Sequence, residues 1–174
     1  MKIRIIGSCG SGKSYLSRNL SKKFMTPHYE IDNMIWDRIA GNRRYPEEER
    51  DSKFFSVVDS DSWIIEGVQY RWTDASVREA DLILILNPNV FLRDYRIIKR
   101  FIRSRLGLET WNYKQSFQNL IKMIVKWNHE YNLDEVFELT ENYSNKRVEI
   151  KTKEEAIRHI QRYLEVTREG NDIT

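Results

Sequence analysis

A glycine-rich segment near the start of the chain constrains the fold more than any other feature. It matches the pattern G-x-x-x-x-G-K-[ST] at every fixed position, and its residues are Gly7, Ser8, Cys9, Gly10, Ser11, Gly12, Lys13 and Ser14. The run 2–6 before it is short and rich in isoleucine, which predicts a buried strand. Residues 14–24 after it have apolar side chains at helical spacing, and Pro27 follows where the predicted helix ends. A strand, this loop and a helix in that order are the context that the pattern requires.

The chemistry of this segment is that of a phosphate-binding loop. Glycines let the backbone turn tightly with its N–H groups pointing inward, and these groups hold phosphate oxygens together with the N-terminus of the following helix. Lys13 supplies a positive charge for the β- and γ-phosphates, and the Ser14 hydroxyl is a magnesium ligand. We therefore expect residues 7–14 to bind ATP with Mg²⁺. The alternative, a glycine-rich turn beside an unrelated lysine, leaves the flanking strand and helix unexplained.

Strands and helices alternate along the rest of the chain. Further strands are predicted at residues 28–31, 63–65, 80–86 and 147–150. Helices are predicted at 90–106, at 117–131 and from the Thr-Lys-Glu-Glu capping box at 152–155 onward. Residues 33–60 are highly charged with scattered apolar positions, and we expect one or two exposed, mobile helices there. The alternation predicts an α/β fold with a parallel sheet and helices on both faces, in a single domain over residues 1–174.

Composition excludes several classes of protein. The chain has 174 residues, a one-domain length, and its net charge of +3 is too small to argue for nucleic acid by itself. Cys9 is the single cysteine, which excludes an internal disulfide, and no Cys/His spacing fits a structural zinc site. No stretch approaches the roughly 18 apolar residues of a membrane span, and the first residues do not follow a signal-peptide plan. We expect a cytoplasmic protein with no membrane partner.

Two carboxylates follow neighbouring strands. Asp32 comes at the end of the second predicted strand and Glu66 at the end of the third. Ligands of open α/β sheets bind beyond the carboxyl ends of the strands, so both side chains should face the phosphate loop. An apolar run that leads into an acid is typical of the strand that serves the nucleotide's magnesium, so Glu66 is a candidate metal ligand with Ser14. Asp32 has an alternative role as a helix cap, and Trp36 either stacks on a ligand or packs.

The helix predicted at 90–106 has four arginines on one side. Spacings of three, four and three residues place them within roughly an 80° arc, and they are Arg93, Arg96, Arg100 and Arg103. The opposite side is expected to face the core through Phe91, Tyr95, Ile98 and Ile102. Guanidinium groups suit phosphate oxygens, so the arginine stripe predicts cations around a transferred phosphoryl group. A solvated basic face is one alternative, and a nucleic-acid patch that includes Arg43 and Arg44 is another.

Taken in order, four segments resemble the adenylate-kinase-like and shikimate-kinase-like branch of P-loop proteins, most closely the subgroup labelled "DNA topology modulation protein". They are the loop 7–14, the run 29–36 (Tyr-Glu-Ile-Asp-Asn-Met-Ile-Trp), Trp63–Gly67, and the arginine-rich helix from Arg93, and they span residues 1 to about 110. The resemblance implies a five-stranded parallel sheet of order 2-3-1-4-5. It also implies an acceptor bound over the strand ends and a short lid at about 104–114.

The resemblance also implies roles for the nucleotide side of the site. Arg100 and Arg103 lie at the base of the lid, where they would contact the γ-phosphoryl group, and Arg96 lies beside the ATP. Glu66-Gly67 occupies the place where nucleotide-kinase-like proteins usually carry Asp-Gly, and the longer side chain still allows contact with magnesium.

On the acceptor side, the resemblance makes residues 33–60 the acceptor-binding region. Asp32 resembles the acid that orients an acceptor hydroxyl, so it takes the proton if the acceptor is an alcohol and only orients it if the acceptor is a phosphate. Arg71 is displaced by one position from an arginine that clamps an acceptor phosphate. Gln69 is the alternative contact for the acceptor, next to Gly67 and Trp36.

The leading hypothesis is a small kinase that transfers the γ-phosphoryl group of ATP–Mg²⁺ to a nucleotide or another small acceptor. The competing hypothesis is a nucleotide-dependent regulatory or DNA-associated protein in which ATP stabilises one conformation and little transfer occurs. Both need the phosphate loop, so the loop alone does not decide between them. The sequence leaves the acceptor open, and it also leaves open whether the protein is a monomer or a homodimer.

Overall fold

The computed structural model describes residues 1–37, 41, 43–108 and 116–171. A parallel sheet lies at the centre of this part of the chain. Its strands are β1 (Lys2–Ile6), β2 (His28–Glu30), β5 (Trp63–Gly67), β6 (Leu82–Leu86) and β7 (Arg147–Ile150). They lie in the order β2-β5-β1-β6-β7 with every neighbouring pair parallel. Counted by sequence within the sheet, this order is 2-3-1-4-5, which confirms the expected topology.

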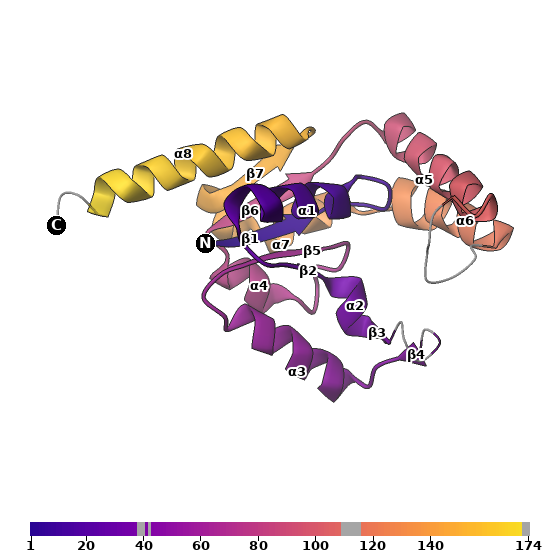
Figure 1. The fold of residues 1–174 in the computed structure, drawn as a ribbon, viewed down its shortest axis with the longest axis horizontal. Coiled ribbons are helices and arrows are strands. Elements are labelled where there is room, and N and C mark those ends of the chain that lie inside the picture. The colour runs from indigo at the N-terminus through magenta and orange to yellow at the C-terminus, as the bar shows by residue number, and fades with distance from the viewer. Residues whose placement is uncertain (38–40, 42, 109–115, 172–174) are drawn as a thin grey trace.

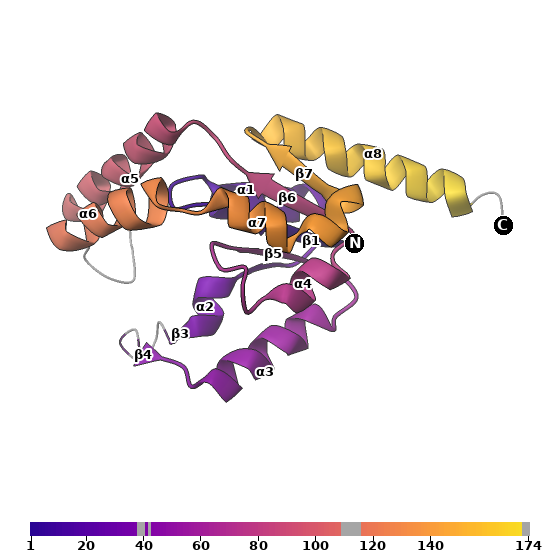
Figure 2. The ribbon, with the colours of Figure 1, turned by 180° about the vertical axis from the view of Figure 1, so that it is seen from behind.

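Helices cover both faces of the sheet and give a three-layer α/β structure (Figures 1 and 2). One face packs against α1 (Lys13–Phe24) and α8 (Lys153–Asn171). The other face packs against α3 (Glu47–Val58), α4 (Asp74–Glu79) and α7 (Leu133–Leu139). The expected fold class is therefore confirmed.

The alternation of side chains along the strands explains why the sheet has two cores. On β1, Ile3 and Ile5 join the core beneath α1 and α8, whereas Ile6 joins the core on the opposite face. A strand buried on both faces has an almost continuous apolar sequence, as in β6, whose five residues are all buried. Arg4 is the exception on β1, because its charged side chain is 0% exposed.

The insert between β2 and β5 is more firmly attached to the core than the sequence predicts. It contains the short helix α2 (Ile31–Ile35), the hairpin strands β3 (Trp36–Asp37) and β4 (Arg43–Arg44), and then α3. The expectation of exposed helices is wrong for the buried side of α3, because Phe54 and Val58 lie one turn apart in the core. Two apolar positions with i, i+4 spacing were sufficient to anchor a helix whose other residues are mostly charged.

Helices α5 (Val90–Arg105) and α6 (Phe117–Ile124) lie at one end of the molecule, and α8 extends beyond the sheet at the other end (Figure 1). The helix expected at 117–131 is divided, because α6 continues into a π-helical turn, η1 (Val125–His129). Residues 109–115 of the expected lid at 104–114 lie outside the described part of the chain. The glycine-rich loop that follows β1 reaches toward α5 and η1 at this end.

The orientation of α5 contradicts the expected core stripe. The four apolar side chains that were expected to face the core are exposed: Phe91 by 76%, Tyr95 by 58%, Ile98 by 41% and Ile102 by 50%. Ile97, which lies between the two stripes, is 1% exposed and packs with α6. The reason is that α5 stands beside the sheet and turns its arginine side toward the phosphate loop, so the apolar side opposite the arginines faces solvent.

The last part of the chain fits the sequence expectation more closely. The capping box at the start of α8 is confirmed, because Thr152 Oγ1 accepts a hydrogen bond from the backbone N–H of Glu155 and the Glu155 carboxylate accepts one from the N–H of Lys151. Before β7, the chain forms α7 and the 3₁₀ segment η2 (Glu141–Lys146), which the sequence analysis did not predict. Among the described helices, none is long and apolar enough to cross a membrane.

The orientation of α5 can be tested with two adjacent isoleucines. Ile97→Ala removes a buried side chain and should lower the free energy of unfolding by about 2–4 kcal/mol. Ile98→Ala makes the same chemical change on the exposed side and should change it by less than about 0.5 kcal/mol. Urea denaturation of the two variants measures both values. Equal losses would contradict the orientation described here.

Candidate functional site

The phosphate loop closes tightly between β1 and α1. Gly10 has a φ of +75°, and a Cβ atom there would lie 2.6 Å from the carbonyl oxygen of Arg93. A side chain at this position would therefore push α5 away from the loop. Gly12 caps α1, so the helix begins at Lys13 with its N-terminus at the loop. The backbone has the arrangement that the sequence pattern predicts for a phosphate site.

Lys13 lies folded across the loop. Its side chain is buried, and Nζ donates hydrogen bonds to the Ser8 carbonyl oxygen at 2.9 Å and to Ser11 Oγ at 3.5 Å. Burial lowers the pKa of the lysine, and the negative charge of Glu66 opposes this effect. A buried ammonium group held by one carbonyl and one hydroxyl can exchange these partners for phosphate oxygens.

Ser14 and Glu66, the two candidate metal ligands, are in direct contact. Ser14 Oγ donates a hydrogen bond of 2.5 Å to Glu66 Oε1, and the pairing of β5 with β1 places Glu66 beside Ile5. Glu66 is 4% exposed, and burial raises its pKa while Lys13 lowers it. A hydroxyl and a carboxylate are hard oxygen ligands of the kind that Mg²⁺ takes together with phosphate oxygens and water. The described residues contain no cluster of three or more acidic, His or Cys side chains, so a metal here would rely on the nucleotide for further ligands.

The arginine side of α5 faces the loop. Arg93 Nη1 donates to Ser8 Oγ at 2.8 Å, and Arg96 Nη1 donates to the Ser11 carbonyl oxygen at 2.6 Å. Arg100 Nη2 lies 3.7 Å from Cys9 Sγ. Arg103 lies one turn further along the same helix and is exposed. Three of the four arginines in the predicted stripe therefore contact the phosphate loop in successive turns of one helix.

A second support for the loop comes from η1, which the sequence analysis did not identify as part of the site. The backbone N–H of Cys9 donates to the Trp127 carbonyl oxygen at 3.2 Å. Asn128 is 1% exposed; its Nδ2 donates to Asp94 Oδ1 at 2.7 Å and its Oδ1 lies 3.4 Å from Ser8 Oγ. A π-helical turn adds one residue per turn and redirects its side chains, and such turns are frequent at functional sites. The signal in the sequence was an asparagine within an otherwise amphipathic helix.

The acceptor candidates Asp32 and Gln69 are brought together. Gln69 Nε2 donates to Asp32 Oδ1 at 3.0 Å, which links the first turn of α2 to the loop after β5. Gly67 permits this approach, because a Cβ atom there would lie 2.9 Å from Ile31 Cβ. Asp32 is close enough to Glu66 to raise the pKa of that carboxyl. The strand ends therefore present carboxylates beside the phosphate loop, as expected from the sheet topology.

Arg71 is turned elsewhere. Its Nε and Nη2 donate to the two carboxylate oxygens of Glu135 at 2.6 and 2.8 Å, and Tyr70 Oη donates to Glu135 Oε2 at 3.0 Å. Glu135 lies in the first turn of α7, in a stretch to which the sequence analysis gave no role. The arginine that resembles an acceptor clamp is thus held in an ion pair.

The two tryptophans near the strand ends differ in their surroundings. Trp36 lies on β3 and is 38% exposed. Trp72 packs edge-on against Phe54 with ring centroids 5.2 Å apart, and the Arg50 guanidinium lies 4.3 Å from the ring centroid. Trp72 therefore contributes to packing beneath the insert, whereas Trp36 has an accessible ring.

Arg4 anchors the loop that carries Gln69 and was not identified from the sequence. Its Nη1 donates to the carbonyl oxygens of Ile5 and Ile65, and its Nη2 donates to the carbonyl oxygen of Gln69 and to Thr73 Oγ1. Burial lowers the pKa of Arg4 to about 10. A charged residue in the middle of an apolar strand was the signal that this position has a specific partner.

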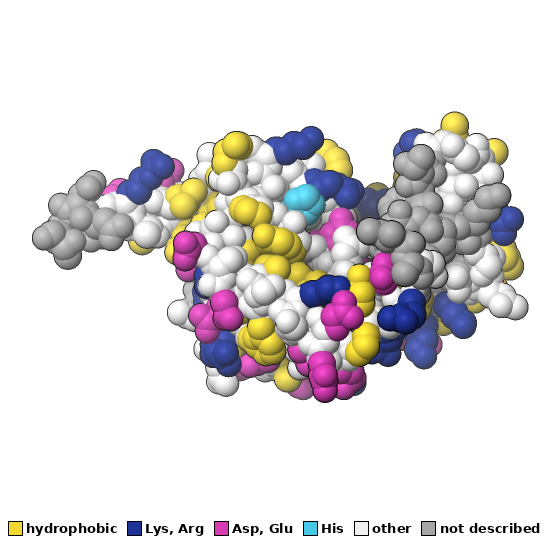
Figure 3. Space-filling view, turned by 60° about the horizontal axis from the view of Figure 1, so that its bottom comes forward, with side chains coloured by type: hydrophobic (Ala, Val, Ile, Leu, Met, Phe, Trp, Pro, Cys, Tyr) yellow, Lys and Arg dark blue, Asp and Glu magenta, His cyan; other side chains and the backbone are white. Residues whose placement is uncertain are grey.

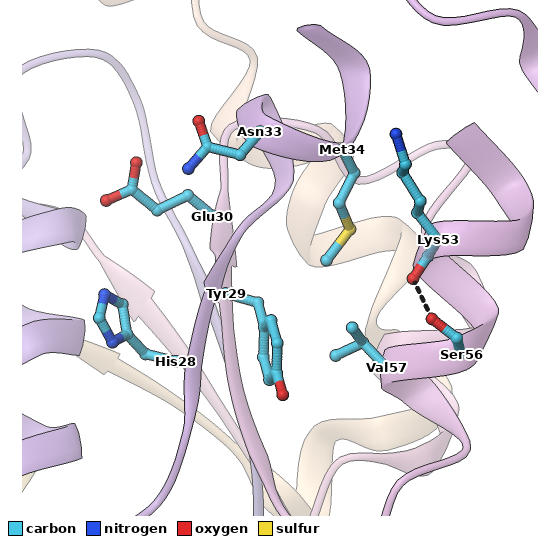
Figure 4. Close-up of a pocket in the computed structure, with 8 residues that line it drawn as sticks. All are labelled: His28, Tyr29, Glu30, Asn33, Met34, Lys53, Ser56 and Val57. Carbon is cyan, nitrogen blue, oxygen red and sulfur yellow. Dashed lines mark hydrogen bonds between the residues drawn. The ribbon is translucent and has the colours of Figure 1, made fainter. Parts of the chain in front are cut away.

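Two hollows lie near the site. The first, with a volume of about 420 Å³, borders the phosphate loop, and it is lined by Ser11, Gly12, Tyr15, Leu16, Leu86, Leu92, Arg96, Lys151, Thr152, Lys153 and Glu154. The second, of about 380 Å³, is a groove between β2 and α3, and it is lined by His28, Tyr29, Glu30, Asn33, Met34, Lys53, Ser56 and Val57 (Figure 4). Figure 3 views the side of the insert, where acidic and basic side chains surround a strip of hydrophobic ones. The first hollow is the one that touches the phosphate loop directly.

Comparisons with known proteins support the fold. No protein-family model matches the chain. Among curated proteins, "Uncharacterized protein YqaC" of Bacillus subtilis (strain 168) is 31% identical over 85 residues, which are 48% of this chain and 47% of that protein. The chain therefore spans about half the length of this relative.

Among solved structures, a gluconokinase from Sinorhizobium meliloti 1021 superposes with a TM-score of 0.52 and 13% identity over 99% of this chain and 95% of that chain. The shikimate kinase from Acinetobacter baumannii in complex with shikimate superposes with a TM-score of 0.60 and 15% identity over 94% of this chain and 93% of that chain. At these identities the likeness concerns the fold, so the chain has the P-loop kinase fold. The closer resemblance to the topology-modulation subgroup stays a prediction.

The anchoring role of Arg4 can be tested by stability. Arg4→Met keeps much of the volume but leaves the buried carbonyl oxygens of Ile65 and Gln69 without their donor, so it should lower the free energy of unfolding by roughly 3 kcal/mol. Arg18→Met is the matched control, because Arg18 is 52% exposed and its loss should cost less than about 1 kcal/mol. Urea denaturation compares the two. Similar small losses in both variants would show that Arg4 is not an anchor.

Proposed function

We propose that the protein is a small-molecule kinase that transfers the γ-phosphoryl group of ATP–Mg²⁺ to a small acceptor. The observation that carries the proposal is the convergence of cations on one loop. Lys13 and the α5 arginines Arg93, Arg96 and Arg100 all contact residues 8–11, and Ser14 contacts the buried carboxylate of Glu66. Phosphoryl transfer depends on positioned positive charge around the phosphates, and this arrangement supplies it.

The nucleotide would lie along the loop with its nucleoside in the adjoining hollow of about 420 Å³. Backbone N–H groups of the loop and Lys13 would hold the β- and γ-phosphates. Arg96 borders both the loop and the hollow, so it would contact the nucleotide between its base and its phosphates. Ser14 and Glu66 would hold Mg²⁺, which neutralises charge on the phosphates when it is bound.

The acceptor would approach from the opposite side, between the strand ends and the insert at residues 33–60. Asp32 and Gln69 lie there as a hydrogen-bonded pair, with Trp36 on the neighbouring hairpin. Arg100 and Arg103 would contact the γ-phosphoryl group from above. The alternative of a DNA-associated regulator was based partly on a free arginine stripe, and three of those four arginines contact the loop.

A transfer assay tests the proposal. The protein is mixed with γ-labelled ATP, Mg²⁺ and a panel of alcohols, nucleosides and nucleotides, and labelled products are separated from ATP and phosphate. We expect label to appear in one acceptor class. Stoichiometric ATP binding without transfer to any member of the panel would favour the regulator instead.

Lys13→Ala should abolish most of this activity. The loss of a charge that contacts the transferred phosphoryl group is expected to lower kcat by about 100-fold or more. Lys22→Ala is the matched control on the same helix, because Lys22 is exposed and distant from the loop. Unchanged turnover in Lys13→Ala would remove the loop from the mechanism.

A further inference from the structure

We infer that the reacting group of the acceptor is an alcohol hydroxyl and not a phosphate, and that Glu135 sets this preference by holding Arg71. The inference rests on the kinase function proposed above and names its acceptor class. It depends on the contacts of Arg71, on the distribution of charge around the loop, and on the geometry of Asp32.

Glu135 is well placed to neutralise Arg71. The two form a two-pronged ion pair with N–O distances of 2.6 and 2.8 Å, and Tyr70 donates a third hydrogen bond to the same carboxylate. The backbone N–H of Glu135 donates to Asn132 Oδ1, the cap of α7, so the start of the helix fixes the position of the carboxylate. Hydrogen bonding to Arg71 lowers the pKa of Glu135, which keeps it ionised. Paired guanidinium and carboxylate groups of this geometry have most of their hydrogen-bonding capacity satisfied by each other.

The charges around the loop are separated into two sides. The cations that contact the loop come from Lys13 and α5. On the acceptor side, Glu30 and Asp32 are close enough to Glu66 to raise its pKa, which marks a cluster of negative charge at the strand ends. A phosphate acceptor would bring almost two further negative charges toward these carboxylates. A hydroxyl acceptor brings none.

Asp32 has the geometry to receive a proton. Gln69 occupies Oδ1 and holds the carboxylate, and Arg4 in turn holds the Gln69 backbone. In the step we propose, the acceptor oxygen forms a bond to the γ-phosphorus while the bond to the β–γ bridging oxygen breaks and ADP leaves. The hydroxyl proton goes to Oδ2 of Asp32 and then to solvent. A phosphate acceptor needs no such base.

The nature of the product bond tests the inference. The protein is incubated with ATP and Mg²⁺ and with either neutral polyols or nucleoside monophosphates, and ³¹P NMR identifies the product. We expect a phosphate ester, whose phosphorus shows no coupling to a second phosphorus. A phosphoanhydride, which shows that coupling, would overturn the inference while leaving the kinase function intact. ATP that binds and yields neither product would instead contradict the kinase function itself.

A set of variants tests the role of Glu135. Glu135→Gln releases Arg71, so a nucleoside monophosphate should inhibit ATP turnover at about tenfold lower concentration, as expected for one hydrogen-bonded charge. Glu138→Gln, an exposed change on the same helix, should leave the inhibition constant unchanged. Adding Arg71→Ala to Glu135→Gln should abolish the gain. The role of Glu135 is wrong if Glu135→Gln does not strengthen inhibition, or if Arg71→Ala alone weakens it tenfold, since Arg71 would then already bind the phosphate.

Discussion

Two buried charges of opposite sign, on Lys13 and Glu66, determine how the rest of the site is arranged. Lys13 is 8% exposed and Glu66 is 4% exposed, and either charge alone would be costly to remove from water. The parallel pairing of β5 with β1 places the carboxylate beside the loop, and Ser14 joins them through its hydroxyl. Each shifts the pKa of the other toward its charged form while burial acts in the opposite direction. The loop is thus a charged, desolvated centre to which phosphate and a divalent cation are the complementary ligands.

The neighbouring elements extend this charge pattern in two directions. On one side, α5 turns its arginines to the loop, and the close approach at Gly10 makes this possible. Its apolar stripe then faces solvent, which is an unusual orientation for an amphipathic helix and follows from the stronger requirement on the arginine side. On the other side, Asp32 and Gln69 form an acceptor edge of negative and neutral groups. Donor and acceptor would therefore meet at a boundary between positive and negative potential, which favours transfer of a phosphoryl group away from its cations to an uncharged nucleophile.

Much of this was predictable from the sequence, for identifiable reasons. The loop pattern, the apolar strands and the acids that end two of them are local signals, and sheet topology brings the ends of parallel strands together. The pairing of Ser14 with Glu66 therefore follows from sequence alone. The orientation of α5 did not follow, because helical periodicity separates two sides without stating which one faces the protein. The roles of Arg4, Asn128 and Glu135 depend on contacts with segments more than 30 residues away, which no local pattern records.

The most direct test of the central claim is calorimetric titration of the protein with ATP, in the presence and in the absence of Mg²⁺. If the Lys13, Ser14 and Glu66 centre is a nucleotide–metal site, ATP should bind one-to-one and saturably with Mg²⁺, and clearly more weakly without it. The weakening is expected because, without the metal, the buried Glu66 carboxylate would face the phosphates directly. Absence of saturable binding, or equal affinity with and without Mg²⁺, would contradict the account.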